Sequence, residues 1–299
     1  MKHNDKKKYL NPIDVAKLNN IAIKAKFVVE GYLLGLHKSP YHGYSVEFSE
    51  HRSYEAADEI KNIDWKLYGK TDRYYIKQYE EETNLRSYII LDTSKSMTFS
   101  NKSISKLEYG ALIAASLAYL MLKQRDAVSL TLFDEKIKNY LPPKSNSNHI
   151  NLIFNNLDKI KSGNDTNTSL ILHELAIKLK KRGLIILISD LLDDPKEIIS
   201  GLKHFLHEKH EIIVFHLFDP KELNLDFSSR IKFKDLETGE EITTDPWLIK
   251  SDYQELTNQF KNHYKKEMGN NKIDYIQLST DKSLGFALNK YLRKRKSSS

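Results

Sequence analysis

Three short segments of the chain place carboxylates beside side-chain hydroxyls. Residues 92–96 read Asp-Thr-Ser-Lys-Ser, a D-x-S-x-S pattern after an apolar run, residues 164–169 read Asn-Asp-Thr-Asn-Thr-Ser, and residues 189–190 read Ser-Asp after another apolar run. Such oxygens suit a small hard cation such as Mg²⁺, which prefers octahedral geometry and keeps several waters. If the segments converge, they predict a divalent-cation site with a position open to an outside ligand. Mn²⁺ and Ca²⁺ are the alternative ions.

The same residue types also have a simpler structural role. Asp and Ser just before a helix are ordinary N-cap residues, and Ser103 or Ser105 could cap a helix that begins at Lys106 without any metal. An isolated D-x-S-x-S pattern is therefore weak evidence. It becomes strong only if the fold brings the three segments to one place.

The elements after residue 84 meet that condition. Short apolar runs predict strands, and apolar residues at helical spacing predict helices. The predicted strands are 86–91, 127–133, 137–141 (a short edge strand ended by Pro142 and Pro143), 183–189, 211–218 and 273–278, and the predicted helices are 106–124, 148–160, 168–181, 195–208, 247–268 and 283–293. This alternation predicts an α/β fold with a Rossmann-like, doubly wound, mostly parallel sheet and helices on both faces. Ligands bind such sheets outside the carboxyl ends of the strands, where residues 92–96 and 189–190 lie.

The flanking regions have other patterns. Residues 11–36 have apolar positions at helical spacing, whereas aromatic and charged residues alternate among turn formers from about residue 31 to residue 82, which predicts short strands. A turn at 237–240 predicts a hairpin. We therefore expect an N-terminal tail and helix (1–30), a small β-rich subdomain (31–84), the α/β domain (85–292) and a basic tail (293–299).

Composition excludes several kinds of chemistry. The 299 residues include no cysteine, which rules out disulfides, thiolate metal sites and a thiol nucleophile. Residues 1–10 hold four Lys and one Asp, and residues 291–299 hold two Lys and two Arg, so the net charge of +7 belongs to the two ends. We interpret these ends as solubilising tails and expect no specific nucleic-acid binding. The polar start and the absence of a long apolar stretch predict a cytoplasmic protein without a membrane span.

The combination of the three segments resembles the metal-ion-dependent adhesion site of von Willebrand factor type A domains. In that family a D-x-S-x-S loop, a Thr and an Asp hold Mg²⁺, and the carboxylate of a partner protein completes the coordination. The resemblance implies the ligands Asp92, Ser94, Ser96, Thr168 and Asp190. Thr168 is preferred because it opens a predicted helix, and Thr166 is the alternative.

A narrower resemblance covers residues 31 to 292. Ordered segments are similar to the bacterial family labelled domain of unknown function 58: GLHKSP at 35–40, EFSEHR at 47–52, IDW at 63–65, YEEE at 79–82, RG at 182–183, ISDLLDD at 188–194 and LETG at 236–239. The chain departs from the family at 57–61, where ADEIK replaces a common Gly-Asp-Asp-x-Arg stretch and a Lys stands for an Arg that could bind bidentately. Membership implies a cytoplasmic MoxR-type AAA+ ATPase as partner.

We therefore expect a Mg²⁺-dependent protein-interaction module and not an enzyme. The alternative is a metal-dependent phosphohydrolase with Asp92 as nucleophile and Asp190 and Asp194 at the ion. Phosphatases of the haloacid-dehalogenase type need D-x-D, and position 94 is Ser. The sequence also contains no G-x-G-x-x-G after a strand, no Gly-Lys-Ser/Thr phosphate loop and no G-x-S-x-G elbow.

Overall fold

The computed structural model describes residues 11–37, 51–53, 65–77, 85–100, 104–161, 163, 167–227, 231–234 and 241–298. Backbone contacts divide the chain into two units, one formed by residues 1–35 with 85–299 and the other by residues 36–84. No helix within the described ranges combines the length and the apolarity needed to cross a membrane.

The larger unit is built on a six-stranded sheet with the strand order β10-β7-β6-β3-β4-β5. The strands are β3 (Arg86–Asp92), β4 (Ala127–Phe133), β5 (Ile137–Lys144), β6 (Leu184–Ser189), β7 (Glu211–Phe218) and β10 (Asp274–Ser279). All neighbours pair in parallel except β5, which runs antiparallel to β4 at the edge. The predicted mostly parallel α/β sheet is confirmed.

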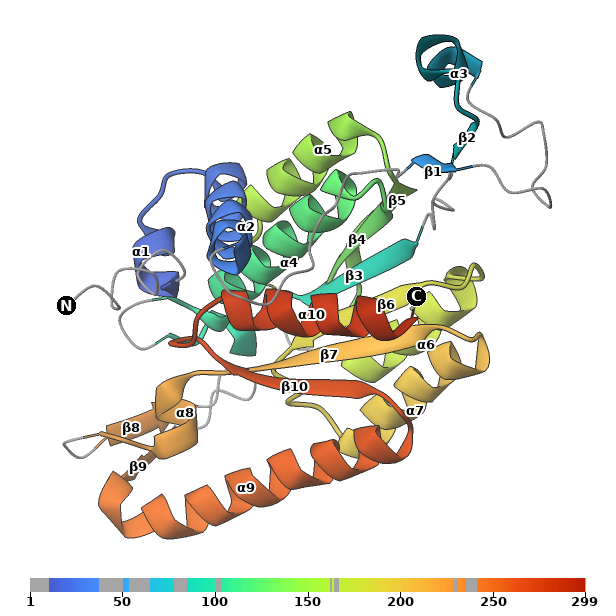
Figure 1. The fold of residues 1–299 in the computed structure, drawn as a ribbon. Helices are drawn as coiled ribbons and strands as arrows, with labels where there is room; N and C mark the ends of the chain where they lie inside the picture. The colour runs from blue at the N-terminus through green and yellow to red at the C-terminus, as the bar shows by residue number, and fades with distance from the viewer. Residues whose placement is uncertain are drawn as a thin grey trace. The chain divides into compact units, whose positions relative to one another are not determined.

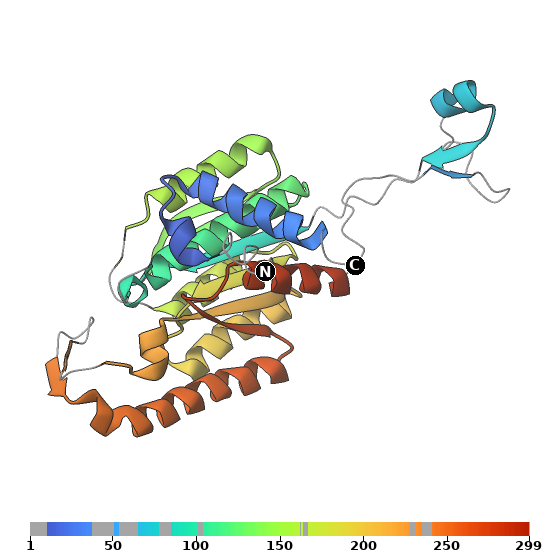
Figure 2. The same cartoon turned by 60° about the vertical axis from the view of Figure 1, so that its left-hand side comes forward.

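Helices cover both faces of this sheet (Figures 1 and 2). The helices of the unit are α1 (Pro12–Ala16), α2 (Ile21–His37), α4 (Lys106–Lys123), α5 (Ser147–Asp158), α6 (Thr168–Lys178), α7 (Pro195–His207), α8 (Pro220–Asn224), α9 (Pro246–Asn270) and α10 (Gly285–Ser298). Helices α2, α4, α5 and α10 lie on one face, and α6, α7 and α9 lie on the other.

Successive side chains of a strand point to opposite faces of the sheet, which explains why helices pack on both faces. Tyr88 and Ile90 of β3 join the apolar core under α6 and α7. Leu91 points to the opposite face, where α4 packs so closely that a Cβ at Gly110 would lie 3.0 Å from the Leu91 side chain. This close approach fixes α4, and with it the loop after β3, against the centre of the sheet.

Some elements of this unit differ from the sequence prediction, which lacked α8 altogether and extended α6 to residue 181. The edge strand was predicted to stop before Pro142, but β5 continues through both prolines to Lys144, because an edge strand tolerates residues that cannot donate to the ladder. The single helix predicted over 11–36 is divided into α1 and α2. Residues 293–296, assigned to a tail, lie within α10.

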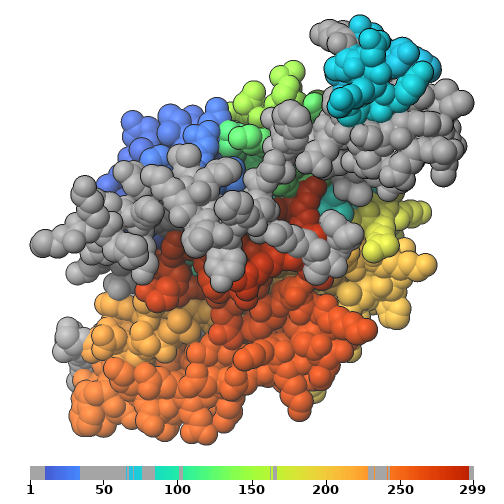
Figure 3. Space-filling view, viewed as in Figure 1, coloured from blue at the N-terminus to red at the C-terminus, as the bar shows by residue number. Residues whose placement is uncertain are grey.

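A short hairpin and a long helix complete this unit. Strands β8 (Ile231–Lys234) and β9 (Glu241–Thr244) pair antiparallel, which confirms the predicted hairpin. The next element, α9, runs along the surface of the unit (Figure 3, orange).

The smaller unit contains two short strands and a helix in its described part. β1 (His51–Ser53) pairs antiparallel with β2 (Tyr75–Lys77), and α3 (Trp65–Thr71) lies between them in the chain. The sequence pattern predicts strands and loops here, and the helix α3 was not expected. The departure from the family pattern at 57–61 lies outside the described residues.

Candidate metal centre

The candidate site forms where the order of the strands reverses. β3 pairs with β4 on one side and with β6 on the other, which places the carboxyl ends of β3 and β6 next to each other. Leu91 is in register with Ile188, so the next residues, Asp92 and Ser189, meet at the edge. The Ser189 hydroxyl donates a hydrogen bond of 2.6 Å to Oδ2 of Asp92.

The first loop folds back onto the Asp92 carboxylate. The backbone N–H of Ser94 donates to Oδ1 of Asp92 at 2.9 Å, and the hydroxyls of Ser94 and Ser96 are 3.0 Å apart. All three residues are buried. The Thr93 carbonyl accepts a 2.7 Å hydrogen bond from the N–H of Gly163, which ties this loop to the threonine-rich segment. The structure thus brings together the three ligands predicted in this loop.

The threonine-rich segment contributes Thr168, the first residue of α6. Its backbone N–H donates to Oδ2 of Asp193 at 2.9 Å, and Asn167 caps the helix. The Thr168 hydroxyl is buried and has no hydrogen-bond partner among the described residues. Thr166, the alternative ligand, lies outside the described residues.

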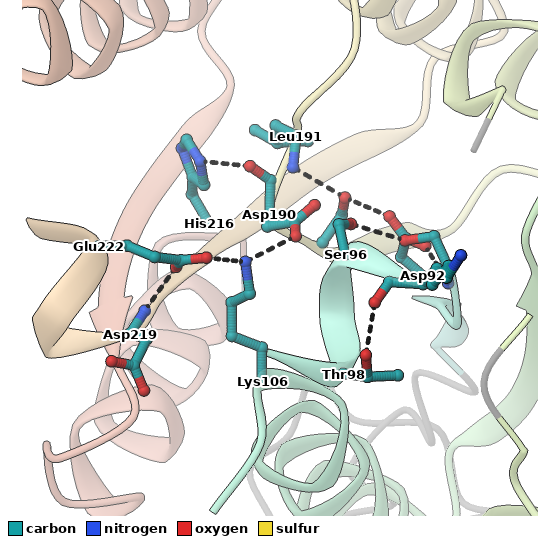
Figure 4. A network of polar contacts seen from close by, with 12 residues as sticks. Asp92, Ser96, Thr98, Lys106, Asp190, Leu191, His216, Asp219 and Glu222 are labelled. Carbon is teal, nitrogen blue, oxygen red and sulfur yellow. Dashed lines mark hydrogen bonds and ion pairs between the residues drawn. The ribbon is translucent and has the colours of Figure 1, made fainter. Parts of the chain in front are cut away.

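The third loop holds Asp190 in a fixed position (Figure 4). Nε2 of His216 donates to the Asp190 backbone carbonyl at 2.8 Å, and the Tyr264 hydroxyl donates to the carbonyl of Leu191 at 3.1 Å. Leu191 has a φ of 51°, a left-handed conformation that turns the chain sharply after Asp190. Oδ1 of Asp190 is buried and, within the described part of the chain, unpartnered.

The other carboxylate oxygen of Asp190, Oδ2, forms an ion pair with a buried cation, Lys106. Lys106 begins α4 and is only 1% exposed. Its Nζ lies 2.9 Å from Oδ2 of Asp190 and 2.5 Å from Oε1 of Glu222 in α8 (Figure 4). The helix dipole disfavours a cation at this end of a helix, so the two carboxylates must compensate. Burial lowers the pKa of Lys106, but the ion pairs outweigh burial and hold that pKa above its usual value.

The two predicted carboxylate ligands repel each other. Burial, with a further contribution from the nearby Asp190, raises the pKa of Asp92 to about 7, although hydrogen bonds from Ser189 and Ser94 act in the opposite direction. A cation between these loops would offset the cost of ionising the buried Asp92 beside Asp190, because an opposite charge favours the ionised carboxylate.

His216 is a neutral support and not a charged group. Burial lowers the pKa of His216 to about 3, so the ring is uncharged at pH 7. Because the Asp190 carbonyl can only accept, Nε2 donates to it, and Nδ1 accepts from the Tyr275 hydroxyl at 2.6 Å. Both ring nitrogens are therefore used in holding the third loop.

The donor set fits a hard divalent cation. The unpartnered oxygens of Thr168 and Asp190 are of the hydroxyl and carboxylate types that Mg²⁺ accepts, and Ser94, Ser96 and Asp92 add further oxygens. Clusters of three or more His, Cys, Asp or Glu suited to a metal are absent from the described residues. A site of this kind would rely on hydroxyls and water for the rest of its coordination. Metal binding by these five residues stays a prediction.

Sequence reasoning missed four residues that shape the site: Lys106, Asp193, His216 and Glu222. His216 interrupts an otherwise apolar strand, which was a usable signal, and Asp193 lies within the quoted 188–194 segment. Lys106 gave no local signal, because a Lys at the start of a helix is normally exposed.

Comparison with known proteins gives one family and one shared fold. Residues 50–264 match the model of a family described as "Protein of unknown function DUF58". An uncharacterized protein of Mycobacterium tuberculosis is 21% identical over 243 residues, which cover 80% of this chain and 76% of that protein. A crystallised aerotolerance-related membrane protein from Bacteroides fragilis, with multiple mutations to serines, shares 17% identity at a TM-score of 0.50 over 70% of this chain and 99% of that chain, which shows a common fold. The crystallised SpRpn10 VWA domain aligns at a TM-score of 0.40, with 11% identity, over 69% of this chain and 94% of that domain.

Proposed function

Because the chain belongs to the DUF58 family and has a von Willebrand factor type A-like α/β fold, we propose that it is a metal-dependent protein-interaction module. In this proposal Mg²⁺ is held by Asp92, Ser94, Ser96, Thr168 and Asp190. When bound, the ion would supply an open coordination position for a carboxylate of a partner protein.

The observation that supports the proposal best is the pair of unpartnered oxygens. The Thr168 hydroxyl and Oδ1 of Asp190 come from two different loops, and both are buried without a partner in the described structure. Leaving a buried polar group unpaired costs about 1–3 kcal/mol. A cation that these atoms could share with Asp92 would offset that cost at both positions.

The environment of Asp92 favours binding over catalysis. Both oxygens of its carboxylate already accept hydrogen bonds, from the backbone of Ser94 and the hydroxyl of Ser189. A nucleophile for phosphoryl transfer needs a free, ionised oxygen, whereas burial raises the pKa of Asp92 to about 7. His216 is buried and already bonded at both nitrogens, so it is poorly placed to act as a general base.

The partner and the location are also part of the proposal. Family resemblance supports a MoxR-type AAA+ ATPase as partner, and the cytoplasm follows as the compartment of such a partner. Mg²⁺ is proposed over Mn²⁺ because the set has few carboxylates and leaves room for water.

A binding assay with the purified chain and a MoxR-type ATPase from the same genome tests this function. We expect binding in Mg²⁺ that is lost in EDTA and lost in the variant Asp92→Asn, while Asp14→Asn, which changes an exposed acid in α1, binds like the wild type. Binding that is indifferent to EDTA and to Asp92→Asn would overturn the proposal. Mg²⁺-dependent hydrolysis of an aryl phosphate that Asp92→Asn abolishes would establish the phosphohydrolase instead.

A further inference from the structure

A cavity of about 300 Å³ lies directly beside the candidate metal centre. Its walls are mainly apolar and come from the loop after β6, the end of β7 and α9, with one residue each from α4 and α8. Leu217 and Phe218 close it on the strand side, and Leu256 and Phe260 close it on the helix side. The volume is at the lower limit of about 300–1,000 Å³ for small-molecule pockets, so it suits a single large side chain better than a cofactor.

The polar end of this cavity is already neutralised. Lys106 lines it together with Asp190 and Glu222, and its ammonium contacts both carboxylates. An anionic ligand would have to compete with these two ion pairs, and a cationic ligand would meet the buried ammonium. The cavity is therefore suited to an apolar group.

The mouth of the cavity exposes leucines to solvent. Leu192 and Leu256 both line the cavity, yet they are 55% and 64% exposed. Covering apolar surface of this kind is favourable, and an apolar side chain that enters the cavity would do so.

Asp190 links the cavity to the metal centre. Its side chain lines the cavity, and its Oδ1 is one of the two unpartnered oxygens of the candidate centre. In Figure 4 Asp190 lies between Lys106 and Glu222 on one side and Asp92 and Ser96 on the other. A bound chain advances about 3.3–3.6 Å per residue, so a segment with a carboxylate at the metal would reach the cavity within a few residues.

We propose that this cavity receives a large apolar side chain of the partner, located within three residues of the carboxylate that binds the metal. The partner segment would then combine one Asp or Glu with one Leu, Met or aromatic residue. This inference rests on the proposed function and adds the sequence chemistry that the partner must have.

A displayed library of nine-residue peptides tests the inference, with a central Asp and random residues on both sides. Selection on the full chain in Mg²⁺ should enrich large apolar residues within three positions of the Asp. The best synthetic peptide should bind roughly tenfold more tightly than its version with Ala at the apolar position. That tenfold advantage should disappear in Leu256→Lys and persist in Leu248→Lys, a matched control on the same helix that is 58% exposed and does not line the cavity.

The outcomes separate this inference from the proposed function. Two results would refute the proposal that the cavity binds an apolar side chain without contradicting the metal centre. One is Mg²⁺-dependent binding of peptides that show no apolar preference, and the other is an equal loss of peptide affinity in Leu256→Lys and Leu248→Lys. Apolar peptides that bind equally in EDTA and to Asp92→Asn would refute the link between cavity and metal. If no peptide binds in a way that depends on Mg²⁺ and Asp92, the inference and the proposed function are both wrong.

Discussion

Two ion pairs, each with a buried acid, lie at opposite ends of the sheet strands: one at the amino edge, where strands such as β4 begin, and one at the carboxyl edge, where β3 and β6 end. Their carboxylates are bonded in different ways. At the amino edge Arg295 of α10 contacts both oxygens of Asp126, just before β4. At the carboxyl edge Lys106 contacts only Oδ2 of Asp190, and Oδ1 is left without a partner in the described residues. The planar fork of Arg can satisfy a whole carboxylate, whereas the ammonium of Lys acts as a point charge.

This difference distinguishes a structural pair from a candidate site. Both acids are buried, so burial of a charge alone does not indicate function. The feature specific to the carboxyl edge is an acid, Asp190, that remains incompletely bonded near a second acid, Asp92, while the unpartnered hydroxyl of Thr168 belongs to a segment bonded to the same loop through Asp193. Each of the following predictions tests whether a divalent cation accounts for that difference.

The largest effect is expected for Lys106→Met. This change leaves the buried Asp190 and the partly exposed Glu222 without their shared cation, which should destabilise the metal-free protein by about 3–5 kcal/mol. Urea unfolding in EDTA and in Mg²⁺ measures it. Because Mg²⁺ would restore a positive charge beside Asp190, the loss should be smaller in Mg²⁺. An equal loss in both conditions would show that no cation binds near Asp190.

The second effect is a pH dependence that belongs to Asp92. Its pKa is raised to about 7 in the folded protein, against about 3.9 in the unfolded chain, so the folded state holds the proton more tightly. Stability in EDTA should therefore fall as pH rises from about 4 to about 7, by up to about 1.4 kcal/mol for each pH unit.

Unfolding curves of Asp92→Asn provide the control for this pH dependence. In the variant, stability should not show the decrease with rising pH that is assigned to Asp92. In the wild type, saturating Mg²⁺ should make this decrease in stability smaller. A wild-type profile that matches the variant in EDTA would contradict the account of the carboxyl edge.

The third prediction concerns the amino edge. Arg295→Met should destabilise the protein by about 2–3 kcal/mol, less than full burial would give because Arg295 is 23% exposed. Mg²⁺ should not restore the lost stability of this variant, and its metal affinity measured by calorimetry should stay at the wild-type value. If Mg²⁺ did restore the stability of Arg295→Met, the two edges would not differ in the way described.

The smallest effect is expected for Thr168→Val. The hydroxyl has no partner among the described residues, so its loss should raise stability in EDTA by about 1 kcal/mol, the lower end of the cost of a buried unpaired polar group. Affinity for Mg²⁺ should nevertheless fall about tenfold or more, while Thr131→Val, an equally buried change in β4, should keep it. A stability loss with unchanged affinity would remove Thr168 from the ligand set.

Much of the fold was predictable because strand and helix periods are local properties. The apolar runs located β3, β4, β6, β7 and β10 to within one or two residues. The α3 helix escaped because its aromatic residues are equally typical of strands. The basic residues at 293–296 were assigned to a tail because their ionic partners, such as Asp126 for Arg295 and Asp274 for Lys294, lie far away in the sequence.

The candidate site was predictable where it depends on strand ends. Asp92 and Asp190 follow buried strands, and the register of β3 with β6 brings their loops together as the sheet topology requires. The family prediction is confirmed, whereas metal binding by these residues stays a prediction. Lys106 and Glu222 could not be placed, because only the tertiary contacts of Lys106 with Glu222 of α8 and with Asp190 of the third loop make a helix-start lysine a buried cation.

A crystal soaked in Mn²⁺ tests the central claim most directly, because the anomalous signal of Mn²⁺ locates the ion without assumption. The account predicts one strong peak with Thr168 Oγ1 and Asp190 Oδ1 among its ligands, near the Asp92 loop, that is absent in crystals of Asp92→Asn. Fully occupied Mn²⁺ bound elsewhere, with no peak between these three loops, would contradict the proposed metal centre.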